Sequence, residues 1–233
     1  MSKKNKYVDF VSDEDFLSCI KWVCDAYPSD SEKISMEKLQ KNTIDPFKLV
    51  FDIVNGELKT EEWISAERIR QNDKTINNRI GEFHQKLLGK VKGWVDLGIG
   101  DESKVDLMKE DKSIFIELKN KFNTMNSDAT DKCRDKLEKA IKNNPQSKAY
   151  WAFLVSKNGD TGDIIWKKDG KEDERIRKIW GSKVYELVTG DPKSLEKTWN
   201  AIYLAIKDLK KSNYSIDEKE MMKLLEFFNY AFH

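Results

Sequence analysis

Apolar residues recur at helical spacing through the first ninety residues of the chain. Ser12 is typical of a helix start and precedes a stripe of four apolar residues: Phe16, Cys19, Ile20 and Val23. The pairs Asp45-Pro46 and Asn55-Gly56 are expected to begin and end a second helix. A third region, residues 60–88, carries the stripe Ile76, Ile80, Phe83 and Leu87. This part is therefore predicted to be mainly helical.

The pattern changes to that of a β-sheet after residue 90. Strands are predicted at residues 94–97, 104–108, 113–119, 149–155 and 163–166. The second and third strands are expected to form an antiparallel hairpin around residues 109–112. A helix from about residue 128 to 142 then leads into the run AYWAFLV, which is typical of a strand covered on both faces.

The last part of the chain is again predicted to be helical. A long helix is marked by Leu195, Trp199, Ile202, Ile206 and Leu209, and a final one by Met222, Leu225 and Phe228. The expected fold class is α/β: a central mixed β-sheet flanked by helices, with an antiparallel hairpin, one strand after an α crossover, and helical elaborations at both ends. We expect a single domain over residues 1–233, with mainly helical parts at 1–90 and 167–233 around a sheet core at 91–166.

Composition narrows the chemistry of this domain. The net charge is +1, so the overall charge does not favour or exclude nucleic acid. No stretch reaches the roughly 18 apolar residues of a membrane span, and a cytoplasmic location without a membrane partner is expected. The three cysteines lack metal-site spacing and are expected to be free thiols. With only two histidines, catalysis must depend on carboxylates and lysines.

The strand at residues 113–119 carries two charges in its most hydrophobic stretch. Phe115, Glu117 and Lys119 share one face of such a strand, and the opposite, aliphatic face is expected to lie in the core. With an even loop, Asp106 stands opposite Phe115 and diagonal to Glu117. Two carboxylates on one face repel each other, and Mg²⁺ relieves that repulsion. A lysine beside them can orient or deprotonate an attacking water, which is the chemistry of phosphodiester hydrolysis.

A plainer interpretation of these charges stays open. An isolated Asp…Glu-x-Lys pattern is more often an ion-pair cluster on an exposed sheet face. The surrounding hairpin and crossover favour a site instead. Asp96 is a second candidate acid, but its spacing to Glu117 is less favourable than that of Asp106. His84 is expected to be a packed core histidine.

Several strings resemble a known family. The spacing from Asp106 to Glu117-Leu118-Lys119 is similar to the PD-(D/E)xK nuclease superfamily, with Val105 where the pattern often has proline. GEFHQKLLG, GWVDLGIGDESKVDLM, IELKNKFNTMN and GSKVYELVTG resemble a family of type II restriction endonucleases that cuts GGNCC-type sites. The resemblance spans about residues 76–210.

The resemblance implies a restriction-endonuclease-like fold and a sequence-specific, Mg²⁺-dependent deoxyribonuclease that leaves 5′-phosphate and 3′-hydroxyl ends. Asp106, Glu117 and the Leu118 carbonyl would ligate Mg²⁺, with Mn²⁺ expected to substitute, and Lys119 would serve the water. Glu82 matches an acid that the superfamily often adds from an upstream helix, although it lies away from the apolar stripe and is otherwise a solvated helix residue. A cognate DNA methyltransferase would be the functional partner.

DNA recognition is expected to involve the segment after the catalytic strand. Candidates for double-stranded DNA contacts are Asn120, Lys121, Asn123, Thr124 and Asn126, together with Lys132 on the next helix. The same residue types are common in turns, helix caps and solvated helix faces, so a purely structural role for these residues stays open. A homodimer is expected on a palindromic site. Two other functions remain: a structure-specific or repair nuclease of the same superfamily, and a non-catalytic DNA-binding module.

Overall fold

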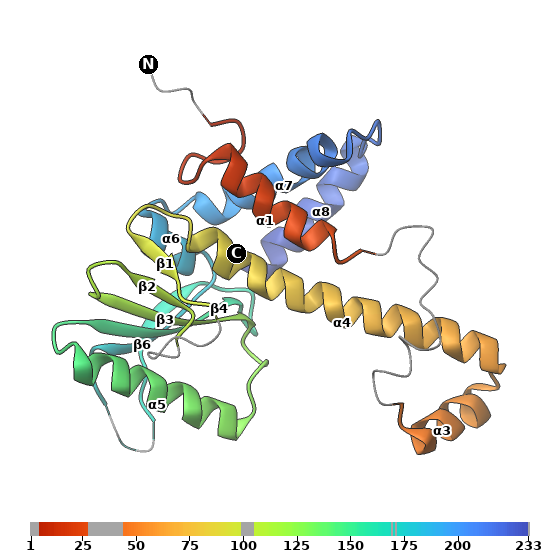
Figure 1. Ribbon diagram of the computed structural model, residues 1–233, viewed down its shortest axis with the longest axis horizontal. Helices are drawn as coiled ribbons and strands as arrows, with labels where there is room; N and C mark the ends of the chain where they lie inside the picture. Colours follow the sequence, from red (N-terminus) through yellow and green to blue (C-terminus); the bar gives the residue numbers. More distant parts are fainter. Residues whose placement is uncertain (1–4, 28–43, 99–104, 169, 171, 233) are drawn as a thin grey trace. The chain divides into compact units, whose positions relative to one another are not determined.

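The computed structural model describes residues 5–27, 44–98, 105–168, 170 and 172–232 (Figure 1). Its helices are α1 (Asp13–Cys24), α3 (Pro46–Gly56), α4 (Thr60–Leu88), α5 (Ser127–Asn143), α6 (Ser182–Thr189), α7 (Ser194–Lys210) and α8 (Glu218–Phe232). Its strands are β1 (Trp94–Asp96), β2 (Leu107–Lys109), β3 (Ile114–Lys121), β4 (Lys148–Val155), β5 (Gly162–Ile165) and β6 (Ile176–Trp180). No helix in these ranges is both long and apolar enough to cross a bilayer.

The six strands form one mixed sheet in the order β1-β2-β3-β4-β6-β5. β1, β2 and β3 pair antiparallel, and β4 pairs parallel with both β3 and β6. The crossover from β3 to β4 runs through α5, as a parallel connection requires. The predicted α/β class, with a hairpin and one strand after an α crossover, is confirmed.

Helices cover both faces of this sheet (Figure 1). Under α5, the row Phe115, Ala149 and Ile176 runs across β3, β4 and β6 and packs on Cys133, Leu137 and Ala140. The opposite face carries Ile116 and Leu118 and is covered in part by α6. Both faces of β3 are therefore buried. The sequence analysis placed only the aliphatic face in the core, but the face with Phe115 and Glu117 is part of the core as well.

Two details of the sheet differ from the sequence prediction. β6 was not predicted, because residues 167–233 were expected to be mainly helical; the sheet continues to Trp180. The hairpin register is shifted by two residues, since Met108 and not Asp106 pairs with Phe115. The turn therefore occupies residues 110–113, where the Asp111 carboxylate accepts the Ser113 N–H. The predicted turn, residues 109–112, and the observed turn both have four residues. The parity of the hairpin is therefore unchanged, and Asp106 stays on the same face of the sheet as Glu117. Lys104 lies outside the described residues.

The predicted helices are present with their caps. Ser12 Oγ accepts the Asp15 N–H at the start of α1, and the Asp45 carboxylate accepts the Phe47 N–H at the start of α3. In α8 only Phe228 of the predicted apolar residues is buried. His84 packs edge-on against Tyr185 and contacts its hydroxyl at 2.9 Å, and burial lowers its pKa to about 4, as expected of a neutral core histidine.

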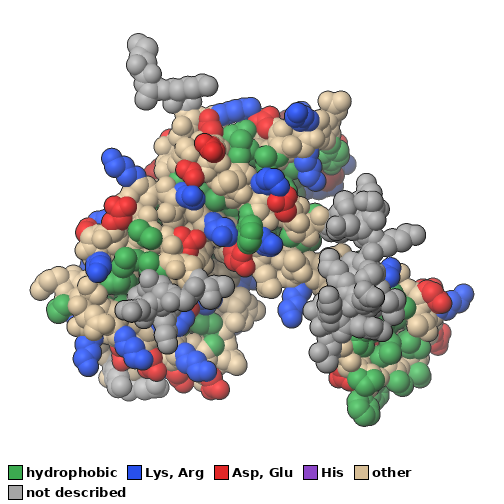
Figure 2. Space-filling view, in the orientation of Figure 1, with side chains coloured by type: hydrophobic (Ala, Val, Ile, Leu, Met, Phe, Trp, Pro, Cys, Tyr) green, Lys and Arg blue, Asp and Glu red, His purple; other side chains and the backbone are tan. Residues whose placement is uncertain are grey.

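The chain forms two compact units. One comprises Met1–Lys21 and Gly81–His233 and contains the whole sheet; the other is Trp22–Ile80. Within the second unit, none of the α3 residues is buried, and hydrophobic side chains gather on its surface (Figure 2). The exposed ones are Phe47, Val50, Phe51 and Val54. Whether the units act as one nuclease domain stays a prediction.

Candidate active site

The β2–β3 hairpin holds Asp106 beside Glu117. The Asp106 N–H donates to the Ile116 carbonyl at 3.0 Å, although the ladder pairs Leu107 with Ile116, so this bond lies one residue off the regular register. Its Oδ2 accepts the Leu118 N–H at 2.7 Å. These two hydrogen bonds, one from the Asp106 backbone and one to its carboxylate, fix Asp106 against β3.

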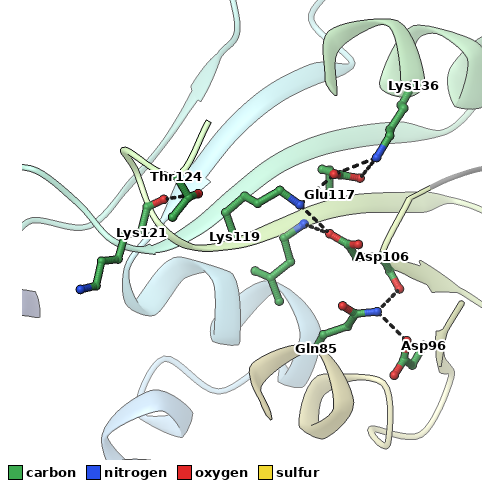
Figure 3. Close-up of polar contacts among 9 residues, drawn as sticks. Gln85, Asp96, Asp106, Glu117, Lys119, Lys121, Thr124 and Lys136 are labelled. Atoms are coloured by element: carbon green, nitrogen blue, oxygen red, sulfur yellow. Dashed lines mark hydrogen bonds and ion pairs between the residues drawn. The ribbon is translucent and has the colours of Figure 1, made fainter. Parts of the chain in front are cut away.

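Lys119 joins the two carboxylates (Figure 3). Its Nζ donates to Glu117 Oε1 at 2.8 Å and to Asp106 Oδ2 at 3.3 Å. Asp106 directly precedes β2, and Glu117 and Lys119 lie two positions apart on β3. The structure therefore brings together the three residues that the sequence singled out. An ammonium between two carboxylates offsets their mutual repulsion.

Glu117 also receives a lysine that the sequence analysis did not include in the site. Lys136 of α5 lies over the carboxylate, with Nζ at 3.0 Å from Oε1 and 3.1 Å from Oε2 (Figure 3). Glu117 is only 3% exposed, and a buried carboxylate is costly unless it is paired. α5 thus covers Glu117 and supplies a counter-charge at once.

The electrostatics of the cluster reflect this burial. Burial raises the pKa of Asp106, and nearby Glu117 adds to the rise, while Lys119 opposes it without cancelling it. Burial lowers the pKa of Lys119, but attraction to Asp106 and Glu117 outweighs that effect and leaves the pKa above its ordinary value. Lys119 is therefore an ammonium at neutral pH, and it acts on its neighbours as a hydrogen-bond donor and a positive charge.

The segment after β3 places polar groups at the end of the catalytic strand. Lys121, Asn123 and Thr124 are exposed, and Thr124 Oγ1 donates to the Lys121 carbonyl at 3.0 Å. The Asn126 side chain is the N-cap of α5 and accepts the Ala129 N–H at 2.9 Å. Lys132 is exposed on α5.

Comparison with known proteins identifies the family. The model of the Eco47II restriction endonuclease family matches residues 8–211 of the 233. The chain belongs to this family. The type II restriction enzyme Eco47II of Escherichia coli is 32% identical over an alignment of 247 positions, gaps included, that covers 97% of this chain and 98% of that enzyme. The type II restriction enzyme Sau96I of Staphylococcus aureus is 32% identical over 216 residues, covering 88% of this chain and 81% of that enzyme. The resemblance seen in the sequence is confirmed.

In this member of the Eco47II family, α4 approaches the site through a single face. A Cβ added at Gly81 would lie 3.9 Å from Cβ of Asn120, and one at Gly89 would lie 2.5 Å from Cβ of Asp96. Between them, Gln85 Nε2 donates to Asp96 Oδ1 at 2.7 Å and contacts the Asp106 carbonyl at 3.4 Å. Gly89 is thus required for close packing of helix on strand.

The two remaining candidate acids have different surroundings. Asp96 Oδ1 accepts hydrogen bonds from Gln85 and from the Gly98 N–H, which gives this carboxylate a structural role between α4 and β1. Glu82 is exposed, three residues before Gln85 on the same helix. Its part in metal binding stays a prediction, whereas Gln85 of the same helix contacts the Asp106 carbonyl.

The donor set suits Mg²⁺ better than a transition metal. Within the described ranges, no group of three or more His, Cys, Asp and Glu side chains is arranged to hold a metal ion. Mg²⁺ does not need such a group, because it keeps several waters and commonly takes one or two carboxylates together with substrate phosphates. Asp106 and Glu117 meet that requirement. The Leu118 N–H donates to Asp106, and because both backbone groups of a strand residue face the same neighbour, the Leu118 carbonyl is expected on that side as well.

Proposed function

We propose that this chain is a Mg²⁺-dependent type II restriction endonuclease that hydrolyses both strands of DNA at a GGNCC-type site and leaves 5′-phosphate and 3′-hydroxyl ends. Membership of the Eco47II family supports the site-specific DNA endonuclease activity. The observation that carries the chemistry is the joining of Asp106, Glu117 and Lys119 on one hairpin, with Lys119 Nζ within 3.3 Å of both carboxylates.

Each residue of the cluster has a distinct task in this proposal. Asp106, Glu117 and the Leu118 carbonyl would hold Mg²⁺, which when bound stabilises charge on the phosphate and acidifies a water; Mn²⁺ would serve in its place. Lys119, as an ammonium, orients the attacking water and the phosphate oxygen by donating hydrogen bonds. Glu117 keeps Lys119 in place, because its Oε1 accepts from Nζ at 2.8 Å.

Digestion of a fully sequenced plasmid tests this proposal. The expected result is a discrete set of fragments in Mg²⁺ or Mn²⁺ and none in EDTA, with every end mapping to one recurring site. Ligation without prior kinase treatment checks for 5′-phosphates. Fragments with random ends, or cleavage confined to branched DNA, would indicate a repair or junction nuclease and not a restriction enzyme. Binding without any cleavage would leave a DNA-binding module.

We also propose that the segment after β3 reads bases while α5 contacts phosphates. Asn123→Ala is expected to reduce discrimination between cognate and random duplexes by about 1–3 kcal/mol, because a side-chain amide can pair with a base edge. Lys132→Ala should weaken binding to all sequences alike and lower the salt dependence. Titration of both duplexes in Ca²⁺ at several salt concentrations measures both effects. Equal losses on the two duplexes for Asn123→Ala would make its role structural. Asn120, Lys121, Thr124 and Asn126 belong to the same proposed contact surface.

A homodimer on DNA is the third part of the proposal. A palindromic duplex presents two strands related by a two-fold axis, so two copies with one site each can cut both. α8 offers an apolar surface for this contact, since Met222, Phe227 and Tyr230 are 59%, 74% and 85% exposed. Phe227→Asp is expected to convert dimers on a cognate duplex to monomers in sedimentation runs. Phe51→Asp on the exposed face of α3 is the matched control and should leave the dimer intact. Loss of the dimer with Phe51→Asp but not with Phe227→Asp would place the contact on α3.

A restriction activity also implies a partner enzyme and a cellular location. An enzyme that cuts a recurring site must act where a cognate DNA methyltransferase protects the host copies of that site. We therefore place the protein in the cytoplasm, functionally paired with such a methyltransferase.

A further inference from the structure

Glu117 is held by two lysines that contact it in different ways. Lys119 takes one oxygen, at 2.8 Å, and extends to Asp106. Lys136 lies at 3.0 and 3.1 Å from the two oxygens, so it sits at the open end of the carboxylate. That is the position from which a cation uses both oxygens at once. The proposed mechanism gives Lys136 no task.

We propose that Lys136 is a positioning residue that competes with the divalent ion for Glu117: it holds the carboxylate before the ion binds and releases it when the ion takes its place. This inference rests on the proposed metal site at Asp106 and Glu117. Its basis is geometric, because an ammonium that spans both oxygens and a metal ion that uses them cannot share the same space.

The surroundings of Lys136 favour such an exchange. Its side chain is 32% exposed, whereas that of Glu117 is 4% exposed, so the lysine can leave toward solvent while the carboxylate stays. It projects from α5 beside the buried positions Cys133 and Ala140, three residues after one and four before the other. A lysine on the edge of a buried helix face can swing outward on its four-carbon stem without moving the helix. Lys119 keeps Glu117 paired during the exchange.

Metal titration of the purified protein without DNA tests the inference. Lys136→Met is expected to bind Ca²⁺ and Mn²⁺ roughly ten-fold more tightly than the wild type, because it lacks both the competitor and a nearby positive charge. Lys136→Arg should restore the wild-type affinity. Lys139→Met, an exposed lysine on the same helix, is the control and should change nothing. Unchanged or weaker metal binding by Lys136→Met would overturn the inference.

Amine labelling separates exchange from simple charge repulsion. In the wild type, Lys136 should be protected from an amine-reactive reagent in EDTA and become reactive on adding Ca²⁺, as followed by mass spectrometry, while Lys139 reacts equally in both. A lysine that stays on Glu117 would be equally protected in both conditions and would contradict the proposal.

The titrations also show which proposal has failed. If neither the wild type nor Lys136→Met binds Ca²⁺ or Mn²⁺ at a site lost in Glu117→Gln, the proposed metal site itself is wrong. If the wild type binds the ion at that site and Lys136→Met binds it no more tightly, only the role of Lys136 is wrong. Thermal unfolding of each variant in EDTA confirms that the protein compared is folded.

Discussion

Glu117→Gln is expected to reduce cleavage of cognate DNA by about three orders of magnitude or more while leaving the fold intact. A neutral amide is a poor ligand for Mg²⁺, and losing the ion removes several kcal/mol of transition-state stabilisation, where about 1.4 kcal/mol is a factor of ten. Single-turnover cleavage in saturating Mg²⁺ measures the effect, and binding of the same duplex in EDTA shows whether substrate recognition survives.

Glutamine is a better replacement than alanine because of how Glu117 is buried. If the Glu117 side chain faced an open cleft, truncation to alanine would leave folding unaffected. In the structure it is 3% exposed and accepts hydrogen bonds from Lys119 and Lys136. Glu117→Ala therefore leaves two ammonium groups close together with one partner fewer, and it should lower the melting temperature, whereas glutamine keeps the volume and one acceptor oxygen.

Two outcomes would count against this role of Glu117. Wild-type cleavage rates in a folded Glu117→Gln variant would make the carboxylate architectural. Equal loss of cleavage and of DNA binding measured in EDTA would place the defect in substrate binding and not in chemistry. Asp128→Asn, at an exposed acid in the first turn of α5, is a suitable control because it removes the same charge away from the cluster.

Features of the fold that are encoded locally could be predicted from the sequence. Ser12 and Asp45 each accept backbone N–H groups of their own helix, and α1 and α3 begin where these residues predict. The apolar run of β4 needs no partner to be recognised, because burial on both faces leaves it continuously hydrophobic.

β6 could not be predicted because its charges are satisfied by distant residues. The strand IRKIW contains Arg177, which pairs with Asp163 of β5 at 2.7 Å. It also contains Lys178, which lies over the Trp151 ring at 4.9 Å from its centroid. Neither partner is visible in the local pattern, so the segment has the composition of a solvated helix or loop.

The same limit applies to the site. Asp106, Glu117 and Lys119 were found because strand periodicity and hairpin parity are short-range rules. Lys136 lies nineteen positions after Glu117, and its contact depends on how α5 packs on the sheet. The available signal is its place on α5, at the edge of the buried face between Cys133 and Ala140. Gln85 depends in the same way on the packing of α4 against the hairpin.

Lys119→Met is expected to slow cleavage by about two to three orders of magnitude while DNA affinity in Ca²⁺ stays close to that of the wild type. The ammonium contacts both carboxylates, and no uncharged side chain of similar length can orient the water and stabilise phosphate charge in its place. Losing one such donor costs about two to three orders of magnitude in rate. Methionine keeps much of the volume, so the comparison isolates the charge.

The raised pKa of Lys119 gives this prediction a second observable. Because Asp106 and Glu117 hold the pKa above its ordinary value, the ammonium persists through neutral and mildly alkaline pH, so the wild-type rate should not depend on deprotonation of Lys119 there. Lys119→Arg, which keeps the charge but not the compact ammonium, should recover part of the activity if donation of a hydrogen bond is the role. A Lys119→Met variant that cuts at the wild-type rate, or a rate that rises only as Lys119 loses its proton, would remove this residue from the proposed mechanism.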